Sequence, residues 1–563
     1  MASIIGKKRG NRIYYYEREL ARVDGKPKVV SQRYLGTGDD VARLISGGGQ
    51  PDKSRHLGFG DVAGVWSVLQ RLGVAEIIDS VVGSTRSPSS LSVGMYLSLI
   101  ITNRVVAPRS KLGFSDWWST TAGDHICGTA GASMDHRRFW DAMDAVSQAQ
   151  LVEIERQVFE VMISEFGLDV RALSLDMTNF ATFIDSHNHR NTIGQRGHAK
   201  QKRNDLGLVG LGLVVTQDGG VPVASHVYAG NRPDVTQFSD MITELTRRYN
   251  NVTDNGELTV VYDAGQGSAT NYETIDAAGL GFVSSAPPSD HPVLLAIPAS
   301  KFTELDGFDG VRIHETTAMI FKRRRRAVVC HSQELHDKQA LSFEETTLAK
   351  AANKLNELAA RLGRGKTRRG RSGVVAEIEQ ICADSWLKRT IVWELTGADP
   401  KSIRLTWSLD AKARQELEDE IFGKRILFTN RDDWSVEAVV AAYRSQSDVE
   451  GSFRQMKDPR VVGVSPMFHW TDQKIRVQLL CCVFALAAAH LMRREVNAAG
   501  INSTNHDSMS VRKILEELHG IQQTNLIYET GGRPSVRSML TEMNETQRQL
   551  FELFGLEKYR PKM

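Results

Sequence analysis

The spacing of apolar and polar residues divides the chain into a helical stretch and a strand-rich stretch. Between residues 59 and 166, apolar positions recur at the spacing of an α-helix, which predicts helices. From Val170 the pattern changes to an alternation of apolar and polar positions, which predicts strands. We expect one strand, then a pair of strands joined by a turn at 217–220, a helix from Asp234, and a strand that ends at Asp263.

A strand and a long helix are predicted again much later in the chain. Residues 426–430 (ILFTN) form the predicted strand. The predicted helix covers 434–457, because Ser435 can cap its start and neither Gly nor Pro interrupts it before Gly451. One face of this helix carries a phenol, a carboxylate and cations, with an amide at its margin: Tyr443, Glu450, Arg454 and Lys457, with Gln446. A solvated helix with charge pairs would show the same pattern, so the helix alone does not identify a site.

The termini and the most apolar segment give further expectations. Residues 11–37 predict a β-hairpin around Asp24–Gly25, which is either a basic arm that binds DNA or a β-module that packs on a neighbouring part. A Gly-rich linker is expected at 46–54, and residues 501–563 are predicted to be helical. The apolar stretch 477–492 is short for a membrane span and contains polar residues, so we expect it to be a buried helix.

Composition sets limits on the class of protein. A chain of 563 residues is too long for one hydrophobic core, so several domains are expected. The apolar share of 41% and the charged share of 24% are ordinary for a soluble protein. The net charge of +3 means that any surface for nucleic acid must be local. The 5 cysteines have neither a disulfide framework nor zinc-ligand spacing, and the first residues lack an apolar signal segment, so we expect a cytoplasmic protein without a membrane partner.

Carboxylates follow two of the predicted strands and lie on the late helix. Asp176 ends the first strand after Val170, Asp263 ends the fourth strand, and Glu450 lies on the helix. Strand ends and an adjacent helix can converge at one edge of a sheet. Mg²⁺ prefers such oxygen ligands, and two ions can activate an attacking oxygen and stabilise a leaving oxygen at phosphorus. A lone aspartate at a strand end is usually a turn former, but three carboxylates in this order favour a metal site.

The segments around these carboxylates resemble a known family. SLDMTNF carries the first aspartate, VVYDAG the second, and Tyr443-x2-Gln446-x3-Glu450-x6-Lys457 the glutamate. On these motifs the chain resembles the DDE transposases of bacterial insertion sequences, in the branch with a strand-rich insertion before its glutamate. The resemblance extends over about residues 60–500 and includes the turn GNRPD at 230–234.

The resemblance implies a role for each matching residue. Asp176, Asp263 and Glu450 correspond to the catalytic, metal-binding triad, which takes two Mg²⁺ ions with Mn²⁺ as a substitute. Tyr443 and Lys457 correspond to positions that contact the terminal DNA phosphates. It also implies a homodimer in a complex with the element ends and target DNA.

One position departs from the family pattern, and further cations are candidate DNA contacts. Gln446 stands where the family has an arginine, and Arg444 or Arg454 could compensate for the missing charge. The basic run at 322–326 could bind the phosphate backbone or be a solvated hairpin. The remaining candidate phosphate contacts come from this run and from the segment GHAKQKR: Arg323, Arg324, His198, Lys200 and Arg203.

We therefore expect an α/β protein with an RNase H-like mixed sheet flanked by helices. A β-rich insertion is expected to interrupt the core, and a helical domain to precede it. The expected parts are an arm with linker, a helical and DNA-binding domain, the first core segment, the insertion, the second core segment and a helical tail: 1–56, 57–165, 166–290, 291–415, 416–500 and 501–563.

The expected function is a DNA transposase that cuts the ends of its insertion sequence by metal-dependent hydrolysis and joins the 3′ ends to target DNA. Two alternatives stay open at this point. One is a transposase-derived protein that binds DNA without cutting it, which Gln446 makes conceivable. The other is an RNase H-like nuclease that cuts DNA and does not join it.

Overall fold

The computed structural model describes residues 2–23, 26–45, 50–83, 91–185, 188–198, 205–249, 257–364, 370–502, 508–528 and 534–561. The chain folds into two compact units. The first unit comprises Met1–Gly64, Asp116–Ala130 and Leu515–Met563, and the second comprises Val65–Ser115 and Gly131–Ile514. Helices α2 (Gly60–Arg71), α5 (Phe114–Trp118) and α20 (Val511–His519) cross the boundaries between these segments.

The first unit contains two antiparallel sheets of three strands each. One sheet consists of the N-terminal strands, followed by α1: β1 (Ala2–Arg9), β2 (Arg12–Val23), β3 (Lys26–Gly36) and α1 (Gly38–Ile45). Strands β2 and β3 are the predicted hairpin, and its turn and residues 46–49 of the predicted linker lie outside the described residues. The unit also contains α6 (Gly123–Ile126) and α21 (Glu545–Leu553).

The second of these sheets corrects the prediction of a helical tail. Its order is β17 (Ser535–Leu540), β16 (Gln522–Tyr528) and β4 (Lys53–Gly58), so it pairs the end of the chain with a segment near its beginning. The partner that satisfies the backbone groups of β16 lies far away in sequence. A local hydrophobic pattern carries no information about such a partner, and the prediction therefore failed there.

Helices make up most of residues 60–166, as the hydrophobic spacing predicted. Besides α2, α5 and α6, they are α3 (Val74–Val82), α4 (Val93–Val106), α7 (His136–Asp144) and α8 (Gln148–Phe166). Helix α8 begins with a capping box between Ser147 and Gln150 and ends at Gly167, whose φ of 57° suits only glycine without strain. Helix α4 is buried over most of its length, which explains why its sequence is apolar on all sides.

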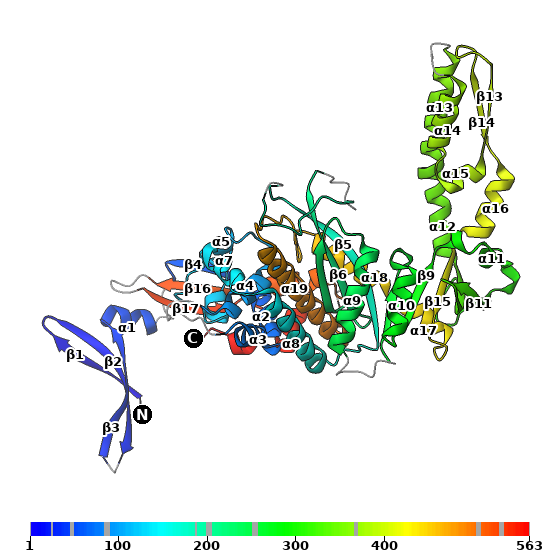
Figure 1. The fold of residues 1–563 in the computed structure, drawn as a ribbon. Helices are drawn as coiled ribbons and strands as arrows, with labels where there is room; N and C mark the ends of the chain where they lie inside the picture. Colours follow the sequence, from blue (N-terminus) through cyan, green and yellow to red (C-terminus); the bar gives the residue numbers. More distant parts are fainter. Residues whose placement is uncertain are drawn as a thin grey trace. The chain divides into compact units, whose positions relative to one another are not determined.

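A sheet of nine strands forms the centre of the second unit (Figure 1). Its order is β10 (Thr303–Glu304), β11 (Val311–Ile320), β12 (Arg323–Ser332), β15 (Lys424–Thr429), β9 (Gly281–Ala286), β8 (Thr259–Tyr262), β5 (Ala172–Thr182), β6 (Gly207–Thr216) and β7 (Pro222–Ala229). Strands β5, β6 and β7 form an antiparallel meander, whereas β5, β8 and β9 run parallel. The order β7-β6-β5-β8-β9 with these directions is the expected RNase H-like arrangement, so the predicted α/β mixed sheet is confirmed.

Helices cover both faces of this sheet, and strand alternation decides which side chains meet which helix. Val261, Val283 and Leu427 lie in one cluster with residues of α17 (Val436–Arg444). Their neighbours Tyr262, Phe282 and Phe428 form an aromatic cluster on the opposite face, with side chains of α9 (Asp234–Tyr249) and α10 (Ala269–Ala277). Successive residues of a strand point to opposite faces. A side chain two positions before or after Val261 along the chain therefore also faces α17 and the helix that follows it.

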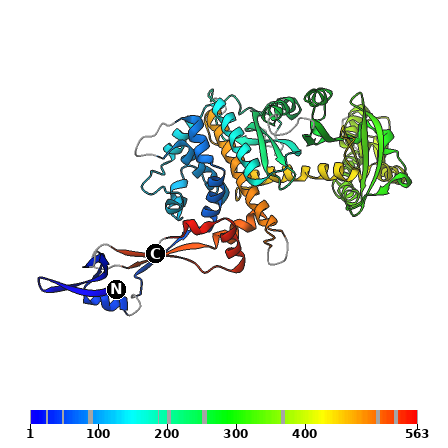
Figure 2. The same ribbon diagram turned by 90° about the horizontal axis from the view of Figure 1, so that it is seen from below.

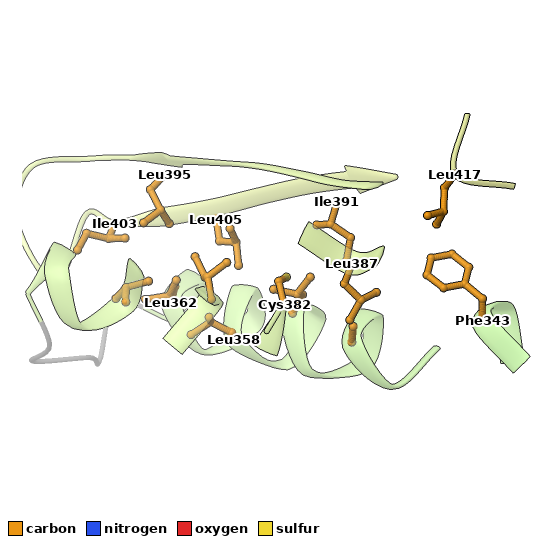
Figure 3. Packing of buried hydrophobic residues seen from close by; sticks show 14 of the residues in the cluster. Phe343, Leu358, Leu362, Cys382, Leu387, Ile391, Leu395, Ile403, Leu405 and Leu417 are labelled. Atoms are coloured by element: carbon orange, nitrogen blue, oxygen red, sulfur yellow. The ribbon is translucent and has the colours of Figure 1, made fainter. Parts of the chain in front are cut away.

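The insertion between β12 and β15 has a hydrophobic core of its own. It consists of α12 (Gln333–Ser342), a π-helical turn (Phe343–Leu348), α13 (Ala349–Gly363), α14 (Arg371–Ile381), α15 (Ser385–Thr390), the hairpin β13 (Ile391–Thr396) and β14 (Arg404–Leu409), and α16 (Ala411–Ile421). Figure 3 shows Leu358 and Leu362 beneath the hairpin residues Leu395 and Leu405. The insertion is therefore less rich in strands than predicted, because β11 and β12 join the main sheet through β15.

Helix α19 (Asp472–Ala498) is the long apolar helix of the second unit. It contacts α4, α7, α8 and β7, and both views show it (orange) between the other helices and the sheet (Figures 1 and 2). By length and composition it could cross a membrane, but 89% of its most apolar window is buried inside the protein. Its apolar sequence is accounted for by this burial, as predicted for 477–492.

Candidate active site

Asp176 and Asp263 lie on neighbouring parallel strands in the second unit. Strands β5 and β8 pair Leu173 with Val260 and Ser174 with Val261. Continuing this register places Asp263, the residue directly after β8, beside Asp176, and adjacent strands are about 4.8 Å apart. Because Val261 and Asp263 are two positions apart along the chain, that carboxylate faces α17 and the helix that follows it.

Asp176 faces the same helices. Ser174 and Asp176 are two residues apart on β5, and the hydroxyl of Ser174 lies 2.8 Å from that of Ser445, the residue between α17 and α18 (Gln446–Lys457). The sequence predicted one helix over 434–457, and the structure divides it at Ser445. Both aspartates therefore lie beneath the helix pair that carries Glu450.

Two side chains of α18 fasten it to these strands on either side of Asp176. The amide nitrogen of Gln446 donates to the carbonyl oxygens of Leu175 and Val261, each at 3.2 Å. The ammonium group of Lys457 donates to the hydroxyl of Thr178 at 2.7 Å. Glu450 lies within about 40° of Gln446 and Lys457 around the helix axis, so its side chain leaves on the side of these anchors. Glu450 is exposed.

The carboxylate of Asp263 is held in its charged form. Its Oδ1 accepts hydrogen bonds of 2.7 Å from the hydroxyls of Ser285 and Tyr443, and Ser285 also accepts one from the amide of Ala264. Burial alone would raise the pKa of Asp263, but the hydrogen bonds from Ser285 and Tyr443 favour the anion, and the pKa lies below its ordinary value. Burial raises the pKa of Tyr443, so its phenol keeps the proton that it donates.

A second set of contacts holds Asp176. Its Oδ1 accepts a hydrogen bond of 2.7 Å from the amide of Met177 and a longer one of 3.4 Å from the side chain of Gln266. Gln266 belongs to the 3-10 turn Ala264–Gln266, which directly follows Asp263, and it links the two aspartates. Analysis of the sequence missed Gln266 and Ser285, because each is a common polar residue outside any motif, and it gave no role to Thr178 within SLDMTNF.

The chemistry of this donor set fits Mg²⁺ or Mn²⁺. All of the candidate ligands are carboxylates, and hard divalent cations prefer oxygen donors. Among the described residues, no three acidic, histidine or cysteine side chains lie close enough together to hold a metal ion. Asp176 and Asp263 supply two neighbouring carboxylates. Glu450, on the facing helix α18, would supply the third.

Two predicted DNA contacts are placed inside the protein. Tyr443 is 5% exposed and Gln446 is 8% exposed, and both side chains bond to protein groups in the sheet. These two residues lie almost one helical turn apart, so they share the face that packs on β5 and β8. Both side chains are therefore turned into the protein, and a contact of Tyr443 or Gln446 with DNA phosphate stays a prediction.

Two of the other predicted DNA contacts on α17 and α18 face outward, and the third, Lys457, bonds to the sheet. Arg444 is exposed, with its guanidinium 4.8 Å from the ring centre of Phe308. Arg454 is exposed as well, and Lys457 is partly buried by its bond to Thr178.

The basic run on β12 is partly used within the protein. Arg323 and Arg325 form ion pairs with Asp276, and Arg326 pairs with Glu315. Arg323 stays exposed despite its ion pair, so a contact of Arg323 with phosphate remains a prediction. Arg324 is also exposed and forms no ion pair among the described residues.

The loop that contains GHAKQKR is described only in part. His198 is exposed, and its carbonyl oxygen accepts a hydrogen bond from the side chain of Asn179 on β5, three residues after Asp176. Lys200 and Arg203 lie outside the described residues.

Comparison with known proteins supports a single family. The family model described as "Transposase DDE domain" matches residues 181–486, which include Asp263 and Glu450 and begin just after Asp176. No curated protein matches the chain. Among solved structures it is similar to a piggyBac transposase synaptic complex with hairpin DNA, determined by cryo-EM, at 8% identity and a TM-score of 0.35 over 81% of this chain and 79% of that chain. Similarity at that level is too low to support a conclusion about function.

Proposed function

Because this chain belongs to the family of transposases with a DDE domain, we propose that it binds the ends of a mobile DNA element, cuts them by metal-dependent hydrolysis and joins the 3′ ends to target DNA. Asp176, Asp263 and Glu450 are the proposed ligands of the divalent ions. The observation that carries this proposal is the register of β5 and β8, which sets Asp176 beside Asp263 beneath the helix of Glu450.

The residues of the chain supply charge and position. When bound, Mg²⁺ would provide activation of the attacking oxygen and stabilisation of the leaving oxygen. Ser285 and Tyr443 keep Asp263 anionic, so it can bind a cation at neutral pH. Gln446 and Lys457 hold α18 against the sheet, so that Glu450 stays near the aspartates.

Exposed cations around these carboxylates would hold the DNA backbone. Arg323, Arg324, Arg444 and Arg454 are the exposed arginines among the described candidates, and His198 lies beside β5. Neutralised phosphates release counterions, so binding through these residues should weaken steeply as salt increases. Because two element ends must be joined in concert, a homodimer on DNA is part of the proposal.

Replacing Tyr443 by phenylalanine is expected to shift the acidic limb of the pH–rate profile for DNA cleavage to higher pH. The change removes a hydrogen bond that lowers the pKa of Asp263, so this carboxylate would become protonated, and unable to bind metal, at a higher pH than in the wild type. Cleavage rates from about pH 3 to about pH 7, a range that includes the ordinary aspartate pKa of about 4, measure the shift. Tyr272→Phe removes a buried phenol on the opposite face of the sheet and should leave the profile unchanged; equal profiles for Tyr443→Phe and wild type would contradict the assignment.

Replacing Gln446 by methionine is expected to lower kcat for cleavage about 10- to 100-fold with little change in KM. Methionine keeps the length of the side chain but loses both hydrogen bonds to Leu175 and Val261, which loosens the helix of Glu450. Ser447→Ala, at the exposed neighbouring position, is the control. An unchanged kcat for Gln446→Met would show that these bonds do not position Glu450.

Joining of DNA separates the proposed function from its alternatives. A labelled duplex from the inverted repeats that flank the coding sequence is incubated with a supercoiled target plasmid and wild-type protein, in Mg²⁺ or in EDTA. Metal-dependent nicks with label joined to the plasmid would establish a transposase. Nicks without joining would indicate an RNase H-like nuclease, and binding without nicks would indicate a transposase-derived DNA-binding protein.

A further inference from the structure

A pocket of about 470 Å³ lies in the second unit, away from the carboxylates described above. Its walls come from α4 and the segment after it, from α7, from the loop before α19 and from α19 itself. The residues that the following argument uses are Arg104, Lys111, Trp140, Phe468, Trp470 and Gln478. The volume is in the range of pockets that hold small organic ligands.

Two cations in the pocket wall are buried without an acidic partner among the described residues. Arg104 is 6% exposed and donates to the carbonyl oxygens of Gly463, at 2.8 Å, and Arg109, while its Nε has no hydrogen-bond partner. Lys111 is 8% exposed, and its ammonium group bonds to the amide oxygen of Gln478. Burial, with Arg104 nearby, lowers the pKa of Lys111 to about 7.

Buried charges without a counterion are unfavourable, and protein interiors normally pair them. Neutral carbonyl and amide oxygens are the partners that the described residues give to Arg104 and Lys111. An anion that enters the pocket would contact two basic side chains at once and would favour the charged form of Lys111. The wall therefore has the character of an anion-binding site.

The same pocket has an aromatic rim. Trp140 is 38% exposed, Phe468 is 55% exposed and Trp470 is 60% exposed. Large apolar side chains that gather at the surface generally mark a binding site. Flat aromatic rings offer stacking surfaces for nucleobases, and this kind of binding tolerates any base because each has a π-face.

The pocket adjoins the end of the strand that carries Asp176. The amide of Phe183, directly after β5, donates to the carbonyl oxygen of Met467 at 2.9 Å. The rings of Phe183 and Phe468 are 5.7 Å apart. From Asp176 to Thr182, the end of β5, the chain covers about 20 Å at the rise of a strand. A DNA strand that leaves the carboxylates along β5 would thus meet the aromatic rim.

We propose that this pocket receives one unpaired nucleotide of the DNA substrate, with its base against Trp470 and the neighbouring rings and its phosphate against Arg104 and Lys111. This inference rests on the proposed function, since it takes DNA as the substrate. It adds that the duplex is opened within about 20 Å of the cut, because a base within a paired stack could not enter the pocket.

The test measures binding in EDTA, so that no cutting takes place. The probes are a six-nucleotide oligothymidylate, an abasic strand of the same length and charge, and a poly-glutamate peptide. The chain has 9 tryptophans, so fluorescence quenching in the wild type is compared with that in Trp470→Ala to isolate the aromatic rim. Competition against a labelled oligothymidylate gives affinities. The variants are Trp470→Ala, which changes an exposed side chain, and Lys111→Met, with Leu341→Ala on α12 as an exposed apolar control.

Oligothymidylate is expected to bind at least about tenfold more tightly than the abasic strand, and to quench tryptophan fluorescence. Trp470→Ala should remove this preference, Lys111→Met should weaken binding of both strands, and Leu341→Ala should change neither. Lys111→Met should also keep or raise the Tm, because a buried charge without a counterion is removed. If Lys111 had only a structural role, Lys111→Met would instead lower the Tm and leave both affinities unchanged.

Equal affinity for oligothymidylate and the abasic strand would overturn the base pocket, and so would tighter binding of poly-glutamate, which would mark an acidic peptide as the ligand. Unchanged binding by both pocket variants would overturn it too. None of these results would affect metal-dependent cutting by the wild type. Failure of that cutting would overturn the proposed function and would leave the binding results standing.

Discussion

Replacing Asp176 or Asp263 by asparagine, or Glu450 by glutamine, is expected to lower the rate of metal-dependent DNA cleavage by about a thousandfold. Each change keeps the size of the side chain and removes one negative charge. The proposed ligands of the divalent cations are all carboxylates, so each loss weakens metal binding. A metal that stabilises charge at phosphorus contributes several kcal/mol, and each 1.36 kcal/mol is about tenfold in rate. Initial rates on labelled duplex at saturating Mg²⁺ measure the effect.

The control for this series is Asp448→Asn. Asp448 lies on the same helix as Glu450 but is half-buried, and burial raises its pKa despite the nearby charge of Arg493. The Asp448→Asn variant should cut DNA at nearly the wild-type rate. Full activity of Glu450→Gln combined with loss in Asp448→Asn would show that the third ligand is Asp448.

Replacing Phe343 by alanine is expected to destabilise the insertion by about 3–5 kcal/mol, the usual range for a fully buried phenylalanine. Its ring is 0% exposed and lies 6.2 Å from the rings of both Trp386 and Phe422, with the guanidinium of Arg414 over it at 5.1 Å. The cavity would weaken the contacts among α12, α15 and α16. Because this cluster is separate from the clusters of the main sheet, hydrogen exchange should rise over residues 333–421 and much less in β5 and β8.

Val392→Ala provides the matched control, since Val392 lies on the hairpin of the same insertion and is 54% exposed. Its effect should stay within about 0.5 kcal/mol. If Phe343→Ala accelerated exchange equally in the insertion and in β5, the two would unfold as one cooperative unit. That result would contradict an independent core for the insertion.

Local patterns were sufficient to predict the strands that carry the aspartates. Strands β5, β6 and β7 are runs of mostly apolar residues, and the turn at 217–220 is short and rich in glycine. Asp263 follows a run of apolar residues that is buried on both faces of the sheet. The helix of Glu450 was predicted to within a few residues, although the break at Ser445 has no signal in the sequence, because it comes from bonds to Ala442 and to Ser174 on β5.

Features that depend on distant contacts were not predictable in the same way. Helical spacing placed Tyr443 and Gln446 on one face with Glu450, but it could not show that this face turns toward β5 and β8. Likewise, the sequence could not show that the basic run on β12 forms ion pairs with Asp276 and Glu315, because these two residues belong to other elements. The pairing of β16 with β4 joins segments more than 450 positions apart, as in the pair Gln522 and Gly58.

The most direct test of the central claim locates the bound metal on the polypeptide. Fe²⁺ takes the place of Mg²⁺ in the wild-type protein, and ascorbate with peroxide generates radicals that cleave the backbone next to the iron. The account predicts breaks near residues 176, 263 and 450, which excess Mg²⁺ suppresses and which Asp263→Asn abolishes at all of these places together. Breaks elsewhere in the chain, or breaks near 176 and 263 that persist in Asp263→Asn, would contradict a shared metal site of Asp176, Asp263 and Glu450.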